Sequence, residues 1–170
     1  MDVVPYYTFL RENSTLNKAE FLARYPAPFL YFQNLPDLEL TDLFTTMRIT
    51  PGVTPPDLGL QGLIHVAKDS ASNAFGMMIT MGRAKNNDLV IPDKRVSKFH
   101  GYFRQVGDAW MCTDANSTNG TQINGVDLPA ERSFQLHSGS VILLSDAIRA
   151  VFLLPEEMHQ QLVEARAWVT

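Results

Sequence analysis

Residues 81–125 read MGRAKNNDLVIPDKRVSKFHGYFRQVGDAWMCTDANSTNGTQING. Short apolar runs in this stretch alternate with clusters of Gly, Asn, Asp and Lys, which include the residues that tight turns favour. Asn124-Gly125 is the strongest turn signal, because both residues tolerate the positive φ of a type I′ hairpin. Many short strands at close spacing predict a β-sandwich or barrel rather than a parallel α/β sheet.

The predicted strands continue on both sides of this stretch. They cover residues 63–68, 75–81, 88–91, 99–105, 109–113, 121–123, 141–144 and 150–154. Pro155 closes the last strand, and residues 156–169 then have the pattern of a terminal helix with two glutamates at its positive N-terminal end. The apolar positions of this helix share one face, which we expect to pack on the domain: Met158, Leu162, Ala165 and Val169.

The first fifty residues have a helical or irregular pattern. Ser14 and Thr15, followed by Glu20, resemble a capped helix start. Pro26 and its neighbouring proline should end that helix near Tyr25. A second helix is predicted over residues 38–47, and the Pro- and Gly-rich residues 49–62 predict a linker or wrapping loop.

Composition limits the class of protein. The chain has 170 residues, of which 45% are hydrophobic and 19% charged, a mixture that can bury a core. Fourteen basic residues against 18 acidic ones give a net charge of -4 and a pI of about 5.5, which argues against a general nucleic-acid binder. The single cysteine, Cys112, excludes an internal disulfide and a multi-cysteine zinc site. Without a long apolar stretch or a secretory signal, the sequence predicts a soluble cytoplasmic protein with no membrane partner and no bound metal.

Three polar segments between predicted strands carry the candidate chemistry. They are residues 81–83 (MGR), 95–100 (RVSKFH) and 116–121 (NSTNGT). Arginine offers a planar fork of donors that suits phosphate, and lysine offers a mobile positive charge. Hydroxyl and amide groups add neutral donors, so the three loops together predict a small anion site. Each segment alone is a weak signal, since an arginine after a strand is usually only solvated, and their order and combination carry the inference.

Taken in order, these motifs closely resemble the forkhead-associated (FHA) domain. The resemblance covers residues 62–154 and includes Gly82-Arg83, Ser97 with His100 three residues later, and the run from Ser117 to Thr121. It implies an eleven-stranded β-sandwich whose loops at one end bind phosphothreonine in an extended peptide. Residues 1–61 then form an N-terminal extension that is partly helical, and residues 155–170 form a C-terminal helix.

The resemblance also implies roles for individual residues. The phosphothreonine ligands would be Arg83, Ser97, Lys98 and Thr118. The peptide backbone would be held by Asn119, Arg95 and Asn124. A structural role in shaping the loops falls to Gly82, His100, Ser117 and Gly120.

The expected function is a phosphothreonine-peptide-binding adaptor that acts downstream of Ser/Thr protein kinases and uses no cofactor. Its partner would be a phosphothreonine-containing protein or peptide, and a Ser/Thr kinase or its substrate is a candidate. The alternative is a phosphorylation-independent scaffold or dimerising subunit that uses the N-terminal extension, and the oligomeric state stays open. An enzyme is the least supported class, because Ser97 with His100 lacks an orienting acid and an oxyanion hole.

Overall fold

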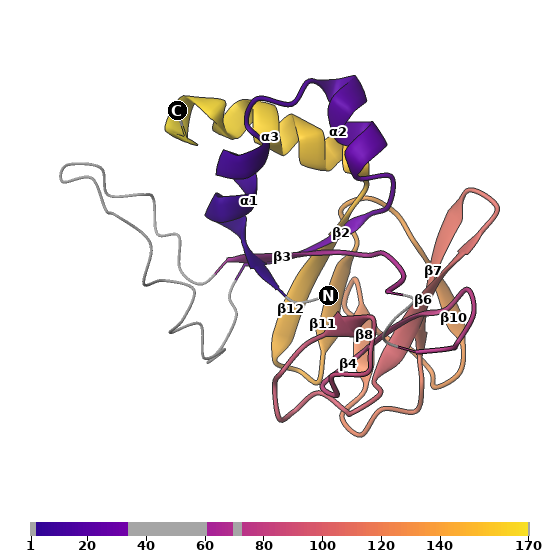
Figure 1. Ribbon diagram of the computed structural model, residues 1–170. Coiled ribbons are helices and arrows are strands. Elements are labelled where there is room, and N and C mark those ends of the chain that lie inside the picture. The colour runs from indigo at the N-terminus through magenta and orange to yellow at the C-terminus, as the bar shows by residue number, and fades with distance from the viewer. Residues whose placement is uncertain (1–2, 34–60, 70–72, 170) are drawn as a thin grey trace.

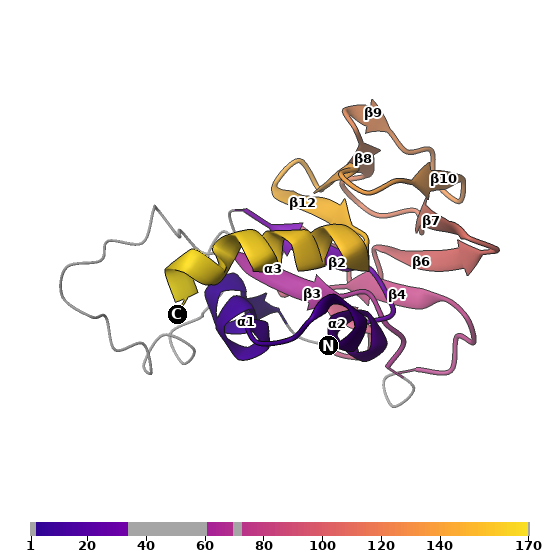
Figure 2. The ribbon, with the colours of Figure 1, turned by 90° about the horizontal axis from the view of Figure 1, so that it is seen from above.

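The computed structural model describes residues 3–33, 61–69 and 73–169, and within them the chain forms two β-sheets and three helices (Figures 1 and 2). The strands are β1 Val4–Pro5, β2 Phe29–Phe32, β3 Gly62–His65, β4 Ile79–Gly82, β5 Leu89–Val90, β6 Gly101–Val106, β7 Ala109–Asp114, β8 Thr121–Ile123, β9 Val126–Asp127, β10 Ser133–Leu136, β11 Val141–Leu144 and β12 Ile148–Leu153. The helices are α1 Tyr6–Asn13, α2 Lys18–Arg24 and α3 Pro155–Val169. The helix predicted over residues 38–47 lies outside the described residues, as does most of the predicted linker.

The two sheets have seven and five strands. Their orders are β1-β3-β2-β12-β11-β8-β9 and β10-β7-β6-β4-β5. Strands β4 and β5 run parallel, and the other paired strands of the described residues run antiparallel. The prediction of a mainly β fold with a C-terminal helix is therefore confirmed. The described residues form twelve strands where eleven were expected, and β1 and β2 come from the N-terminal segment.

Buried apolar side chains from both sheets form the core between them. Phe103 of β6 and Phe152 of β12 place their ring centroids 6.5 Å apart, and Trp110 of β7 packs on Phe152 at 6.3 Å. Cys112 of β7 is fully buried in the same core. Burial raises the pKa of the Cys112 thiol to about 12, so this cysteine is a packing residue rather than a nucleophile.

Strand β2 was not predicted from the sequence, although it lies between β3 and β12 in the seven-stranded sheet. Its sequence is FLYF, without the alternation of apolar and polar residues that marks a half-exposed strand. The structure explains the pattern: Leu30 and Phe32 enter the core between the sheets, whereas Phe29 enters a second apolar cluster under the helices. Both faces of β2 are covered, so all four positions are apolar.

Helix α2 begins two or three residues later than the sequence pattern suggests. Its N-cap is Asn17, whose side-chain oxygen accepts a hydrogen bond from the Glu20 N–H at 3.0 Å. The Glu20 carboxylate accepts one in return from the Asn17 N–H at 2.8 Å, which completes a capping box. Ser14 and Thr15 therefore do not cap this helix. Its end near Tyr25 is confirmed.

The three helices lie together on one side of the molecule, over the seven-stranded sheet (Figures 1 and 2). Met158 and Leu162 of α3 are fully buried against Phe9 and Phe21 of the N-terminal helices. Polar contacts add to this packing, since the Tyr6 hydroxyl donates to the side-chain oxygen of Gln161 at 3.0 Å. The terminal helix thus packs on the domain as its apolar face predicts. In the part of the chain that the structure describes, no helix is both long and apolar enough to cross a membrane.

Candidate functional site

Backbone hydrogen bonds join the end of β4 to the loop before β6. The Arg83 N–H donates to the Ser97 carbonyl at 2.9 Å, and the Ala84 N–H donates to the Lys98 carbonyl at 3.1 Å. Two of the three candidate segments are therefore paired along their backbones. This pairing places Arg83 beside Ser97 and Lys98, as the candidate anion site requires.

Gly82 permits this close approach. A Cβ atom at this position would lie 2.4 Å from the carbonyl oxygen of Lys98, which is too close for any side chain. The same oxygen accepts a hydrogen bond at 2.7 Å from the side-chain amide of Asn87, which is buried. Gly82 and Asn87 together fix the backbone of Lys98 against the end of β4.

Ser97 also joins the third candidate segment. Its hydroxyl oxygen accepts a hydrogen bond from the Thr118 N–H at 2.9 Å and lies 3.3 Å from the Thr118 hydroxyl. The two residues are 21 positions apart in sequence, so only the folded chain brings them together. All three segments therefore converge at Ser97.

Two positive charges flank this point. Arg83 and Lys98 are both exposed, and the Arg83 Nε donates to the Val96 carbonyl at 3.2 Å. This bond orients the guanidinium, and no hydrogen bond among the described residues engages its two Nη groups. The loops thus combine an oriented arginine fork, a lysine and two hydroxyl groups, a donor set that suits a phosphate group.

His100 braces the loops from beneath. It is fully buried, and its Nδ1 accepts a hydrogen bond from the Ser97 N–H at 3.2 Å. Nε2 must then carry the proton, and it faces the Gly120 carbonyl at 3.2 Å and the Thr121 hydroxyl at 3.1 Å. Burial lowers the pKa of His100, although the nearby Asp114 charge and the Gly120 carbonyl act in the opposite direction. A neutral, buried imidazole with both nitrogens engaged is a structural brace rather than an exposed catalytic base.

Asp114 organises the third loop, a role that the sequence did not predict for it. Its carboxylate accepts hydrogen bonds from the Ser117 N–H at 2.7 Å, the Ser117 hydroxyl at 2.7 Å and the Thr121 hydroxyl at 2.6 Å. These bonds hold both ends of the Ser117–Thr121 loop. Gly120 lies within that loop at φ +77°, a conformation that favours glycine. An aspartate that ends a strand directly before a Ser/Thr-rich turn is the sequence signal that could have identified it.

Asn119 and Arg95 are neighbours, but they make contacts within the protein. The Asn119 amide donates to the Arg95 carbonyl at 2.8 Å, which ties together the loops that carry Ser97 and Thr118. The Arg95 side chain forms an ion pair with Asp93, with Nε to Oδ1 at 2.9 Å and Nη2 to Oδ2 at 2.6 Å. A hydrogen bond from Arg95 is the main reason that the pKa of Asp93 is lowered.

Asn124 is not drawn into this cluster by any hydrogen bond among the described residues. Its side-chain oxygen accepts from the Val141 N–H at 2.8 Å, and its own N–H donates to the Val141 carbonyl at 2.8 Å. With φ values of +52° and +80°, Asn124 and Gly125 form the hairpin turn that the sequence predicts. The observed contacts of Asn124 anchor that hairpin to β11.

The titratable groups do not suggest a metal centre. Among the described residues, no group of three or more His, Cys, Asp or Glu side chains could hold a metal ion. The convergent side chains at the loops are donors rather than metal ligands.

The chain is similar to known proteins over the part that carries the candidate loops. Residues 79–145 match the family model of the FHA domain. Three solved structures illustrate the likeness. An FHA domain from a structural and functional study of phosphothreonine-dependent FHA interactions has 30% identity and a TM-score of 0.41, over 45% of this chain and 76% of that one. The MEK1 FHA domain in complex with a phosphothreonine peptide of HOP1 has 30% identity and a TM-score of 0.42, over 46% and 81% of the two chains. The FHA domain of an Arabidopsis thaliana hypothetical protein has 29% identity and a TM-score of 0.43, over 45% and 66%.

No curated protein matches the chain. The family model spans β4 to the end of β11, and the three candidate loops lie inside it. The chain therefore belongs to the FHA domain family.

Proposed function

We propose that this protein binds phosphothreonine peptides at the loops around Ser97. The observation that carries the proposal is the hydrogen bond from the Thr118 N–H to the Ser97 hydroxyl, because it joins segments that are distant in sequence. Two of the solved FHA domains support it, since one was studied for phosphothreonine-dependent interactions and another holds a phosphothreonine peptide. FHA domains are binding modules rather than enzymes.

The chemistry of the loops fits one phosphate group. Phosphothreonine carries about -1.5 to -2 charge at neutral pH and three acceptor oxygens. Arg83 and Lys98 would supply the opposing charge, and Ser97 and Thr118 would donate to the remaining oxygens. A net charge of -4 on the chain disfavours a long polyphosphate backbone but leaves room for a local site of this size.

Groups beside the phosphate site would form hydrogen bonds with the peptide backbone. Asn119 stands at the side of the cluster formed by Ser97 and Thr118, and we propose that its amide exchanges the Arg95 carbonyl for a carbonyl of the peptide. Shallow recognition of this kind predicts a dissociation constant in the micromolar range, about -8 kcal/mol. The protein would thereby act as an adaptor for targets of a Ser/Thr protein kinase.

Binding of matched peptides tests the proposal. Wild-type protein should bind a phosphothreonine peptide and not its unphosphorylated form, as measured by calorimetry or fluorescence anisotropy. Arg83→Ala and Ser97→Ala should each weaken binding by about tenfold or more, because charged hydrogen bonds contribute about 1.5–3 kcal/mol. Arg104→Ala is the matched control, since Arg104 is an exposed arginine on β6 outside the three loops. Equal binding of both peptides would contradict the proposal and favour the phosphorylation-independent scaffold.

A further inference from the structure

Two exposed phenylalanines stack on each other, and one of them, Phe99, directly follows Lys98 of the candidate phosphate site. Phe75 is 58% exposed and Phe99 is 40% exposed, and their ring centroids lie 6.0 Å apart with only 4° between the planes. Met77, two residues beyond Phe75, is 78% exposed. Exposed aromatic surface is costly in water, and contiguous patches of it usually mark binding sites. We call the Phe75 and Phe99 pair the aromatic platform.

The backbone of Phe75 is held in place. Its N–H donates to the side-chain oxygen of Asn73 at 3.2 Å, and its carbonyl accepts from the Met78 N–H at 3.1 Å. The second of these bonds closes a tight turn in which Gly76 has φ +58°. The ring is therefore presented to solvent from a fixed turn.

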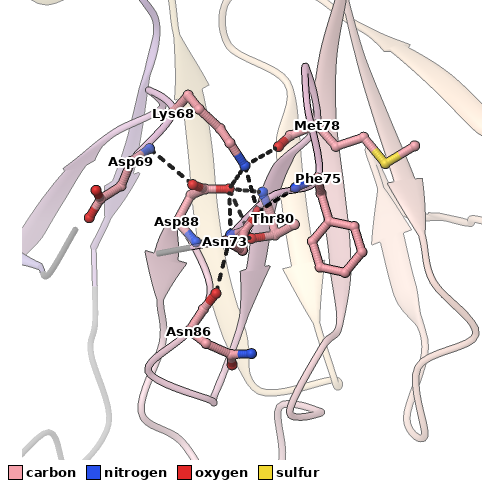
Figure 3. A network of polar contacts seen from close by, with 8 residues as sticks. All are labelled: Lys68, Asp69, Asn73, Phe75, Met78, Thr80, Asn86 and Asp88. Carbon is pink, nitrogen blue, oxygen red and sulfur yellow. Dashed lines mark hydrogen bonds and ion pairs between the residues drawn. The ribbon is translucent and has the colours of Figure 1, made fainter. Parts of the chain in front are cut away.

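A buried carboxylate anchors this turn to the sandwich. Asp88 is fully buried, and its Oδ2 accepts from the Lys68 amine at 3.0 Å, the Asn73 amide at 3.2 Å and the Thr80 N–H at 2.7 Å (Figure 3). Burial disfavours the charged form of Asp88, but the hydrogen bonds from Thr80, Lys68 and Asn73 outweigh it and lower the pKa. In Figure 3 the Phe75 ring projects away from this network. The network thus fixes Asn73, and Asn73 fixes Phe75.

The chain and one hydrogen bond link the platform to the segments of the candidate phosphate site. Phe99 follows Lys98 directly, so their Cα atoms are about 3.8 Å apart. On the other side, the Asn73 amide donates to the Asn86 carbonyl at 3.1 Å, in the turn that follows Arg83. Phe99 therefore lies in the segment that carries Ser97 and Lys98, and Phe75 is linked through Asn73 to the turn that follows Arg83.

From these contacts we infer that the aromatic platform is a specificity subsite that binds a large apolar side chain of the same phosphopeptide. The inference rests on the proposed phosphothreonine site, which would fix one point of the peptide. An extended peptide advances about 3.3 Å per residue, so four residues on either side of the phosphothreonine reach about 13 Å from it. Two parallel rings offer a flat, apolar face without a charged group, which suits leucine, methionine or an aromatic side chain.

The test is a phosphothreonine peptide library that is degenerate at four positions on each side, followed by single peptides. The wild-type protein should select a large apolar residue at one flanking position. A peptide with leucine there should bind about tenfold more tightly than the same peptide with alanine. Phe75→Ala and Phe99→Ala, tested separately, should each reduce this ratio to about two or less and leave the affinity for the alanine peptide unchanged.

Phe134→Ala is the matched control, because Phe134 is the other exposed phenylalanine of the described residues and lies on β10, at the opposite edge of the five-stranded sheet from β5. A thermal melt of each variant verifies that it is folded. The platform inference would be wrong if binding depends on phosphate but shows no apolar preference, or if the preference survives both substitutions. Either result would leave the proposed phosphothreonine site intact. Binding that does not depend on phosphate would overturn both.

Discussion

His100 Nε2 lies 3.8 Å from Oδ2 of Asp114, and the hydroxyl of Thr121 hydrogen-bonds to both. Both side chains are buried. Through His100 this cluster reaches the Ser97 backbone, and through Asp114 it reaches Ser117. The loops that carry the candidate phosphate ligands thus share one buried polar support beneath them.

The buried imidazole predicts a loss of stability in acid. Because the pKa of His100 is lowered in the folded state, the unfolded chain binds more protons, and stability falls as the pH drops below about 6.5. His65 has a pKa that burial lowers and should contribute in the same direction. Urea unfolding of the wild type at pH 8, 6.5 and 5.5 should show this decrease, and His100→Gln should reduce its size. If the free energy of unfolding depends on pH equally in the wild type and in His100→Gln, His100 is not a source of the acid destabilisation. His137→Gln, at an exposed histidine, is the control for loss of an imidazole.

Removal of the Asp114 carboxylate should release the Ser117–Thr121 loop. Asp114→Ala leaves the donors of half-buried Ser117 and buried Thr121 without their acceptor, so we expect a loss of about 3 kcal/mol in the free energy of unfolding. Phosphopeptide binding should weaken in parallel, because Thr118 lies in the same loop. Asp108→Ala, at an exposed turn, should change neither quantity measurably. Chemical denaturation and peptide titration of both variants make the comparison.

A methyl group at Gly82 should separate two segments of the candidate phosphate site. Gly82→Ala would force the Lys98 carbonyl away from β4, since backbone atoms cannot approach a Cβ to 2.4 Å. We expect a loss of about 1–3 kcal/mol in stability, as for other overpacked positions. Peptide affinity should fall more than the stability change alone explains, because folded Gly82→Ala holds Ser97 and Lys98 in displaced positions. Wild-type affinity in a folded Gly82→Ala protein would show that this backbone pairing does not shape the site.

The ion pair between Arg95 and Asp93 predicts a gain of affinity when it is removed. If Arg95 contacts the peptide, its guanidinium must leave the Asp93 carboxylate, and an exposed pair of this kind is worth about 0.2–1 kcal/mol. Asp93→Asn should therefore tighten phosphopeptide binding by about two- to fivefold. The double variant Asp93→Asn with Arg95→Ala should lose that gain. If the double variant keeps the gain of affinity, the gain comes from the loss of the Asp93 negative charge and not from release of Arg95.

The N-terminal segment should be required for folding of the sandwich. Residues 62–154 were expected to form the domain, but β2 is inserted between β3 and β12, and we propose that residues 29–32 belong to the same folded unit. A chain that begins at residue 62 should lack cooperative unfolding in circular dichroism. Phe29→Ala in the full chain should cost about 3–5 kcal/mol, whereas exposed Phe134→Ala should cost much less. A stable, cooperative chain from residue 62 would support the shorter domain.

Sequence patterns predicted most of the β-sheet correctly, where turn signals separate the strands. Strands β7 and β11 begin at the predicted residue, after turns at Gly107-Asp108 and Gly139, and β8 ends at the predicted residue, directly before the turn at Asn124-Gly125. The pattern did not predict β1, β2, β9 or β10, of which β2 and β10 are the longer strands. In β2 both faces are covered, and β10, with the sequence SFQL, lies at a sheet edge and is mostly exposed. In neither strand do the residue types indicate that the segment pairs with a neighbouring strand.

The sequence by itself determined the turns, the mainly β fold and the set of chemical groups available to the candidate site. These depend on which residue stands at each position and on conformational preferences that act over a few residues. Only the tertiary structure decided that Ser97 meets Thr118, that the Asn119 amide reaches the Arg95 carbonyl and that Phe75 stacks on Phe99. The stretch from residue 81 to residue 125 holds every candidate phosphate ligand, but not Phe75, nor β2, which completes the sheet. Contacts between residues distant in sequence follow from the packing of the whole chain, which no local pattern encodes.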